Sequence, residues 1–156
     1  MESMIRKAEA RDLEAVNGLL RQVLAVHHKG RPDLFNLATK YAPEELKALL
    51  QNDETPVFVG ADEEGHVLGH GFCVLQHSGG QLMEEHDTLY IDDICVDEAA
   101  RGLGVGRALY DAILGFARER GCHNVTLNVW SCNPGAMKFY EKMGLVPYKV
   151  GMEQIL

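Results

Sequence analysis

The segment 101–107, with the sequence RGLGVGR, restricts the fold of this chain more than any other feature. It connects a mostly apolar run at 89–96 to a stretch whose apolar residues recur at helical spacing, so it joins a predicted strand to a predicted helix. Its glycines let the backbone approach a ligand closely, and the unpaired N–H groups and dipole of the helix favour a phosphate there. An ordinary glycine-rich turn is the alternative that three glycines alone leave open.

Strand and helix patterns alternate along the rest of the chain, which predicts an α/β fold. The predicted elements are, in order, strand 5–8, a helix capped by Asp12, a short helix from Pro43, strands 57–62, 67–75 and 89–96, a helix from Gly104 to Gly121, strand 125–130, a helix from Asn133 to Gly144, and a closing strand-like segment 146–156. No repeat or linker divides these elements, so residues 1–156 are expected to form one domain.

Charge and composition narrow the classes of partner. A formal net charge of −8 argues against nucleic acid, whose phosphates need a basic face, and is compatible with a cationic substrate. No apolar run is long enough to cross a bilayer and the first residues lack a signal-peptide pattern, so we expect a cytoplasmic protein without a membrane contact. The four cysteines form no CxxC pair and the histidines have no ligand-like spacing, so we expect reduced thiols and no metal.

Two motifs at a defined separation carry a family resemblance. Arg101, Gly104 and Gly106 form the pattern R-x-x-G-x-G, and residues 128–145 contain an Asn-Pro helix start, the pair Phe-Tyr and a final Gly-Leu. The first pattern resembles the pyrophosphate-binding signature of the GNAT superfamily of N-acetyltransferases, and the second resembles a later part of the same domain. Two other phosphate motifs do not fit, because Arg107 replaces the third glycine of GxGxxG and the Lys-Ser/Thr pair of a P-loop is absent.

The resemblance implies a particular fold and an acetyl-CoA site. It implies a mostly antiparallel mixed sheet of about six to seven strands, flanked by about four helices and splayed between the fourth and fifth strands. Pantetheine would pair with the backbone of the fourth strand, and the pyrophosphate would bind the amides that begin the following helix. The acetyl-CoA-binding residues expected in this way are Ile94, Cys95, Val96, Arg101, Gly102, Leu103, Gly104, Val105, Gly106, Arg107, Asn133, Ala136 and Phe139.

The chemistry of acetyl transfer requires a proton acceptor and a proton donor. An alkyl amine with a pKa near ~10 must lose a proton before it attacks a thioester, and a carboxylate can take that proton directly or through water. The segment 90–96 is similar to the strand of polyamine acetyltransferases that carries an acidic pair, which implies Asp92 as the general base. Alternation along a strand predicts that Asp92 and Asp93 point to opposite faces. Tyr140 matches the tyrosine that protonates the departing thiolate in many members.

Each of these assignments has a structural alternative. Tyr140 fits an ordinary core aromatic, and the acidic pair fits a solvated strand edge or a salt bridge to a helix. His27 and Phe35 are expected to line the acceptor site, because the resemblance implies a substrate wall built from the first two helices. Trp130 and Asp93 are expected to face the same site, and each of the three rings also fits a core or loop position.

The expected function is transfer of acetyl from acetyl-CoA to a primary amine of a small molecule or peptide. The alternatives are a non-catalytic acyl-CoA sensor and an unrelated nucleotide-binding protein. A homodimer is left open because dimerisation is common in the family.

Overall fold

One five-stranded sheet, in the order β1-β2-β3-β4-β5, forms the centre of the computed structural model, which describes residues 4–156. The strands are β1 (Met4–Lys7), β2 (Val57–Ala61), β3 (Val67–Ser78), β4 (His86–Val96) and β5 (Asn124–Leu127). The first four pair antiparallel in chain order, and β5 runs parallel to β4. The predicted hairpin of β2 and β3 is confirmed, with Val59 opposite His70.

Four α-helices connect or flank these strands: α1 (Leu13–Gly30), α2 (Pro43–Gln51), α3 (Val105–Glu119) and α4 (Pro134–Met143). Two short 3₁₀ turns, Ala10–Asp12 and Glu98–Ala100, precede α1 and α3. The predicted ends of α4 are confirmed, because the Asn133 side chain accepts a hydrogen bond from the Ala136 N–H and Gly144 ends the helix at φ +104°.

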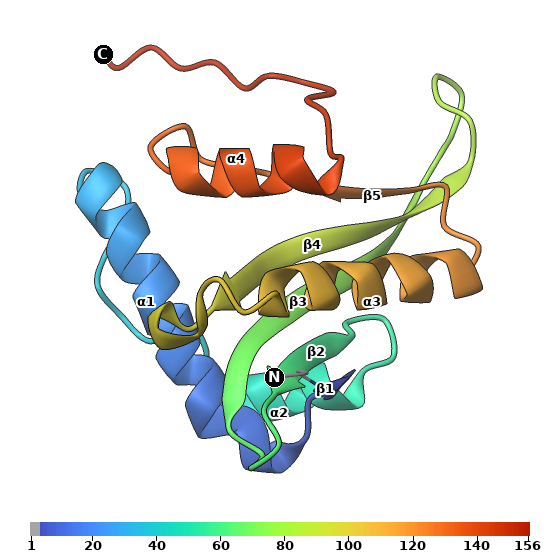
Figure 1. Cartoon of the computed structure of the whole chain (residues 1–156). Helices are drawn as coiled ribbons and strands as arrows, with labels where there is room; N and C mark the ends of the chain where they lie inside the picture. Colours follow the sequence, from blue (N-terminus) through green and yellow to red (C-terminus); the bar gives the residue numbers. More distant parts are fainter. Residues whose placement is uncertain (1–3) are drawn as a thin grey trace.

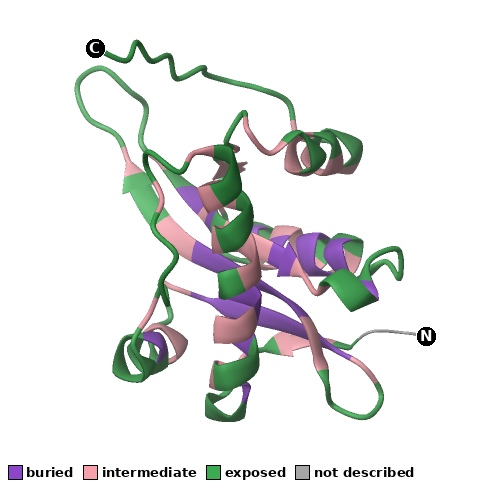
Figure 2. Cartoon of the chain, turned by 90° about the vertical axis from the view of Figure 1, so that its left-hand side faces the viewer, coloured by how far each residue is buried: buried purple, intermediate pink, exposed green. Residues whose placement is uncertain are grey.

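Helices cover both faces of the sheet (Figure 1). The core between the sheet and α3 is centred on Leu89, Ile91, Leu109 and Ile113, which are all 2% exposed or less. On the opposite face, Val16 and Leu20 of α1 and Leu46 of α2 pack against β2 and β3. The buried residues follow the middle of the sheet and the sides of the helices that face it (Figure 2). Periodicity of the apolar residues therefore determines which side of each helix is inside.

The strand count differs from the six to seven that the family resemblance implies. Residues 146–156, expected to close the sheet as a strand, have no strand partner in the described chain and are exposed throughout. A strand exists only when its N–H and C=O groups meet those of a neighbour, which no local pattern can provide. The described part of the chain thus has a sheet of five strands.

Asp12 also differs from its predicted role. Its side chain makes no capping hydrogen bond to α1. Instead the buried carboxylate pairs with Arg6 of β1, with Oδ2 2.7 Å from Nη1 and Oδ1 2.9 Å from Nη2, and accepts a hydrogen bond from the Glu9 N–H. Arg6 outcompetes the helix amides because a charged bidentate partner is the stronger donor.

Candidate active site

The sheet opens between β4 and β5. The two strands pair from Thr88 opposite Asn124 to Ile91 opposite Leu127; β5 then ends while β4 continues to Val96. Among residues 4–156, one edge of β4 is therefore without a strand partner over residues 92–96. The side chains of Ile94 and Val96 pack against the α3 core, and an open edge offers its backbone groups to an extended ligand.

The N-terminus of α3 lies at the end of this open edge. Gly102 and Gly104 both have φ +83°, a left-handed conformation that favours glycine. Gly104 is the N-cap residue and provides no side-chain acceptor, so the first amides of α3 have neither a helical partner nor a cap. Arg101 and Arg107 are exposed beside them. Free N–H groups and the positive end of a helix dipole can bind an anion, and the two arginines could add charge to such a site.

Gly106 has a packing role that the motif did not reveal. A Cβ at this position would stand 2.7 Å from Phe139 Cζ and 3.4 Å from Val96 Cγ2. Gly106 is buried, and its missing side chain lets α4 pack closely on the start of α3. Two residues that sequence reasoning assigned to acetyl-CoA, Gly106 and Phe139, thus contact each other.

A β-bulge in β4 determines where the side chains of Asp92 and Asp93 point. Phe72 of β3 lies opposite Asp93 and Cys73 lies opposite Ile91, so Asp92 is the extra residue on β4. A bulge breaks the alternation of side chains and redirects the residue at its centre. The prediction that Asp92 and Asp93 point to opposite faces is wrong for this reason, as their contacts show.

Both carboxylates lie on the side of the sheet that α1 and α2 cover. Asp92 Oδ2 is 3.0 Å from Lys40 Nζ and 3.5 Å from the hydroxyl of Tyr41, whose ring stacks on Phe72 with 5.7 Å between centroids. Asp93 Oδ2 is 3.0 Å from His70 Nε2. The Asp92 side chain is 33% exposed and that of Asp93 only 12%, so Asp92 is the more accessible carboxylate.

His70 and Lys40 were not identified as members of this site. His70 is fully buried, and its Nδ1 has no hydrogen-bond partner among the described residues, whereas its Nε2 contacts Asp93. Burial alone would lower the pKa of Lys40, but the hydrogen bond and charge of Asp92, with smaller effects of Tyr41 and Asp93, raise it. Lys40 stands in an irregular segment far from Asp92 in sequence, so no local signal identifies it.

Tyr140 lies on α4, half-buried and next to Phe139, with 5.3 Å between the ring centroids. Burial, together with Asp93 and Cys95, raises the pKa of Tyr140 well above its ordinary value. The phenol therefore keeps its proton at neutral pH and is able to act as a donor. Cys95 itself is buried beneath α1, where burial and the charge of Asp93 raise the pKa of its thiol to about 12.

Three of the expected acceptor residues form one aromatic cluster. Phe35 lies 5.0 Å from both the His27 and the Trp130 ring centroids, and His27 lies 6.5 Å from Trp130. The cluster joins α1, the segment after it and the loop before α4. Burial lowers the pKa of His27, against the opposing charge of Asp93, so the ring is neutral at pH 7. Within residues 4–156, no group of three His, Cys, Asp or Glu side chains could hold a metal ion.

Curated proteins and a family model match most of this chain. Residues 23–145 match the model of the Acetyltransferase (GNAT) family. The chain is 31% identical over 158 residues to a protein named probable glucosamine 6-phosphate N-acetyltransferase 2 of Oryza sativa subsp. japonica, covering 95% of the chain and 84% of that protein. It is 30% identical over 117 residues to an uncharacterized N-acetyltransferase of Methanocaldococcus jannaschii, with 75% of the chain covered. The matched region spans 50% of that second relative's length and 36% of the rice glucosamine 6-phosphate N-acetyltransferase 1.

Solved structures share the fold. A tetramutant of the BH1408 protein from Bacillus halodurans superposes with a TM-score of 0.94 and 31% identity, covering 98% of this chain and 99% of that one. The aminoglycoside N-acetyltransferase AAC(6')-Iy, in complex with a bisubstrate analogue of CoA and acetylneamine, superposes with a TM-score of 0.76 over 100% of this chain and 99% of that one. At 18% identity, this second likeness shows the fold alone. In the described residues, no helix is both long and apolar enough to span a membrane.

Proposed function

The chain belongs to the GNAT family of acetyltransferases, and we propose that it transfers acetyl from acetyl-CoA to a primary amine by direct attack, within a single domain. One observation carries this proposal: the open edge of β4 leads to the uncapped start of α3, Asp92 on that edge is a partly exposed carboxylate, and the phenol of Tyr140 on α4 has a pKa that burial, Asp93 and Cys95 raise. These are the groups that the reaction needs to bind a thioester ligand, remove a proton and supply one.

The same features fit acetyl-CoA as the co-substrate. The amides of residues 102–107 and the side chains of Arg101 and Arg107 would hold its pyrophosphate, because the start of α3 is uncapped and carries no acidic residue in its first turn. The backbone at Ile94 and Val96 would pair with its pantetheine arm along the open edge of β4. Acetyl-CoA supplies the activated acetyl group, and these residues orient it beside the acceptor amine.

Asp92 is proposed as the group that takes the proton from the acceptor amine. The bulge leaves Asp92 without a cross-strand partner, and its side chain is partly exposed. The Lys40 ammonium 3.0 Å away shows that an alkylammonium group fits against this carboxylate. Because aspartate is short, a water relay between the amine and Asp92 is favoured over direct transfer. His70 would hold Asp93 through the 3.0 Å contact, and Asp93 would face the acceptor.

Tyr140 is proposed as the donor to the departing CoA thiolate. Its raised pKa keeps the phenol protonated, and the charge of Asp93 disfavours the phenolate further. A phenol in this state hydrogen-bonds to sulfur as negative charge develops there. His27, Phe35 and Trp130 would form an apolar wall for the carbon skeleton of the acceptor.

Release of free thiol from acetyl-CoA, measured against polyamines, aminoglycosides, amino sugars, amino acids and short peptides, tests the activity and identifies the acceptor class. Thiol release that depends on one amine class is expected. In the variant Tyr140→Phe we expect turnover to fall about ten-fold or more, with little change in CoA affinity. Tyr110→Phe is the matched control, because Tyr110 is buried in the α3 core.

Three outcomes contradict parts of the proposal. Unchanged turnover in Tyr140→Phe would remove Tyr140 from the mechanism. CoA binding without turnover across the whole panel would favour the acyl-CoA sensor. Absence of CoA binding, measured against NADH and ATP, would refute the proposed acetyl-CoA site.

A further inference from the structure

The side chain of Lys40 ends at the position where the proposed reaction needs an amine. Its Nζ is 3.0 Å from Asp92 Oδ2, and Lys40 is the only lysine of residues 4–156 that forms an ion pair with a carboxylate. Asp92 is the group proposed to take a proton from the acceptor, and a lysine side chain ends in a primary alkyl amine. Lys40 therefore presents the chemical group of the proposed acceptor to the same carboxylate.

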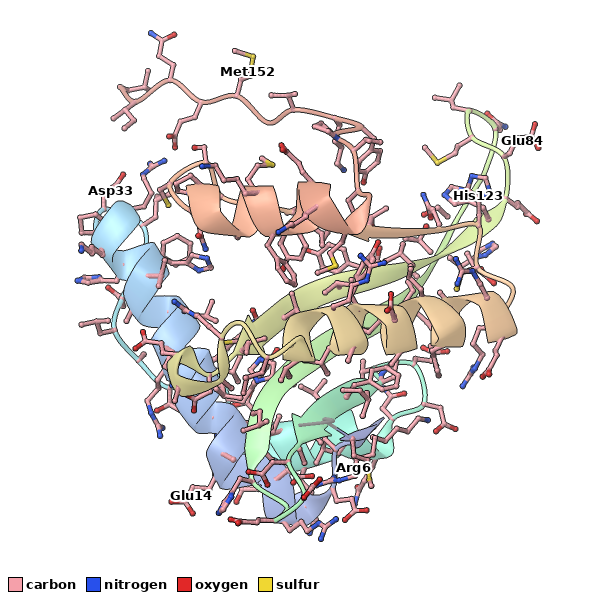
Figure 3. The ribbon with its side chains drawn as sticks, viewed as in Figure 1. Arg6, Glu14, Asp33, Glu84, His123 and Met152 are labelled. Atoms are coloured by element: carbon pink, nitrogen blue, oxygen red, sulfur yellow. The ribbon has the colours of Figure 1, made fainter. Side chains whose placement is uncertain are left out.

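The segment that carries Lys40 is held against the body of the protein on both sides of this residue. In Figures 1 and 3 the connection between α1 and α2 runs back along α1. Before Lys40, the carbonyl oxygen of Phe35 lies 2.7 Å from His28 Nδ1 of α1. After it, the ring of Tyr41 stacks on Phe72 of β3, with 5.7 Å between centroids. The backbone contacts on either side thus direct the Lys40 side chain to β4.

The open edge of β4 would bring a thioester to the same place. The start of α3 lies beside Val96, because a Cβ on Gly106 would stand 3.4 Å from Val96 Cγ2. From there the unpaired edge runs back to Asp92. A ligand with its pyrophosphate at the start of α3 and its arm along this edge would end near the ion pair of Asp92 and Lys40. An amine held beside a thioester reacts much faster than one that must collide with it.

We propose that the protein acetylates its own Lys40 when acetyl-CoA is bound and no acceptor is present; this inference rests on the proposed acetyl transfer. Lys40 Nζ gives a proton to Asp92 and attacks the carbonyl carbon of the thioester. A C–N bond forms and the C–S bond breaks, and the thiolate leaves with the bonding electrons and takes up a proton. Because the ammonium loses two protons and the thiolate gains one, the products are an acetyl amide, free CoA and one proton.

The modification would change the charge at the site. An acetylated lysine is neutral, so Asp92 would lose the cation that it pairs with in the unmodified protein. A cationic acceptor would then meet no competition from Lys40. Self-acetylation would therefore convert a form in which Lys40 occupies Asp92 into a form that is open to the acceptor.

Peptide mass spectrometry of the full chain, incubated with acetyl-CoA and no added amine, tests the proposal. We expect an acetyl group at Lys40, gained about ten-fold or more faster than at Lys47, an exposed lysine of α2 that reports the uncatalysed background. The rate constant at Lys40 should not change on dilution, as transfer within one molecule requires. Asp92→Asn should lower the rate at Lys40 to that at Lys47, whereas Asp53→Asn, at an exposed turn, should change neither rate.

Thiol release gives a second measurement with the same incubation. Free thiol should appear in a burst of one equivalent per chain, because each chain has one Lys40. Lys40→Arg should abolish the burst, since arginine keeps the positive charge but its guanidinium stays protonated and does not attack a thioester. Calorimetry with CoA checks that this variant retains its binding site. Lys47→Arg is the matched control and should keep the burst.

The outcomes separate this proposal from the proposed function. Acetylation of Lys40 no faster than that of Lys47, in protein that binds CoA, would overturn self-acetylation and leave transfer to an external amine intact. Absence of CoA binding would refute both. Acetylation that slows on dilution would show transfer between molecules, and acetylation that Asp92→Asn leaves unchanged would show that the ion pair has no part in it. Either result would overturn the proposal.

Discussion

At the residue scale, the position of Lys40 matters most for the acceptor. Its ammonium is 3.0 Å from Asp92 Oδ2 and presents the same chemical group as an alkyl amine acceptor. Asp92 raises the pKa of Lys40 despite partial burial, so Lys40 is charged at neutral pH. If Asp92 is the general base, as we propose, an acceptor amine would have to displace Lys40 from Asp92 before it could lose a proton there. The two side chains of the pair are 33–39% exposed, so breaking this ion pair costs little free energy.

Lys40→Met tests this competition. We expect the KM for a cationic acceptor to fall about two- to five-fold, because a partly exposed ion pair contributes less than ~1 kcal/mol. The KM for acetyl-CoA should stay unchanged in steady-state kinetics. Lys47→Met, at an exposed lysine of α2, serves as the control. A rise in the acceptor KM would show instead that Lys40 binds the acceptor, as expected for an acceptor that carries phosphate.

At the scale of single elements, the start of α3 is the place where backbone conformation most directly requires glycine. Gly102 and Gly104 both adopt φ +83°, and no atom lies within 4 Å of a Cβ placed on either. A side chain there is disfavoured by backbone conformation and not by crowding inside the protein. Gly106 is the opposite case, because Phe139 fills the space of its Cβ. A substitution at 106 is therefore expected to disturb the packing of α4, whereas one at 104 is expected to act on the proposed anion site.

Gly104→Ala tests the anion site. We expect CoA affinity, measured by calorimetry, to fall about ten-fold or more, because the backbone amides shift to relieve a strain of about 1–2 kcal/mol. Gly65→Ala is the matched control, since Gly65 has φ +88° and equal open space but lies in the β2–β3 turn. Both substitutions should lower the free energy of unfolding by similar amounts. Equal CoA affinity in the two variants would argue against phosphate binding at this helix.

At the scale of the whole molecule, the sheet carries a core on each face, and an ion pair connects its edge strand β1 to the segment that precedes α1. Arg6 of β1 and Asp12 before α1 make this connection through two short hydrogen bonds. Burial would raise the pKa of Asp12, but the hydrogen bonds from Arg6 and from the Glu9 N–H, with the charge of Arg6, lower it below its ordinary value. A lowered pKa in the folded state means that the ionised carboxylate stabilises the fold.

Asp12→Asn separates this ion pair from a helix cap. Asparagine caps helices as well as aspartate does, so a capping role predicts little change. The ion pair predicts a loss of about 2–4 kcal/mol in the free energy of unfolding at pH 7, measured with urea. The contribution is present above the unfolded pKa of ~3.9 and is lost as pH falls through the lower folded pKa, so the two proteins should converge in acid. Asp53→Asn, at an exposed turn, is the control.

The sequence by itself determined the features that act over a few residues. The ends of α4 at Asn133 and Gly144 and the β2–β3 hairpin depend on local backbone conformation and local hydrogen bonds. The glycine segment before α3 and the family it belongs to could be identified for the same reason, since motif spacing lies within one stretch of chain. His27, Phe35 and Trp130 were expected on one wall by resemblance, and the structure brings their rings together.

Only the tertiary structure decided the features that require a partner distant in sequence. The bulge at Asp92 depends on the register of β4 with Phe72 and Cys73 of β3. Because of this bulge, Asp92 and Asp93 lie on the same side of the sheet and not on opposite sides as predicted. Lys40 meets Asp92 and His70 meets Asp93 across separations that carry no sequence pattern. In the part of the chain that the structure describes, the sheet has five strands because segment 146–156, although it alternates like a strand, lacks a neighbouring strand there. Strand pairing and ion pairing each require two partners, and a local stretch of sequence specifies only one of them.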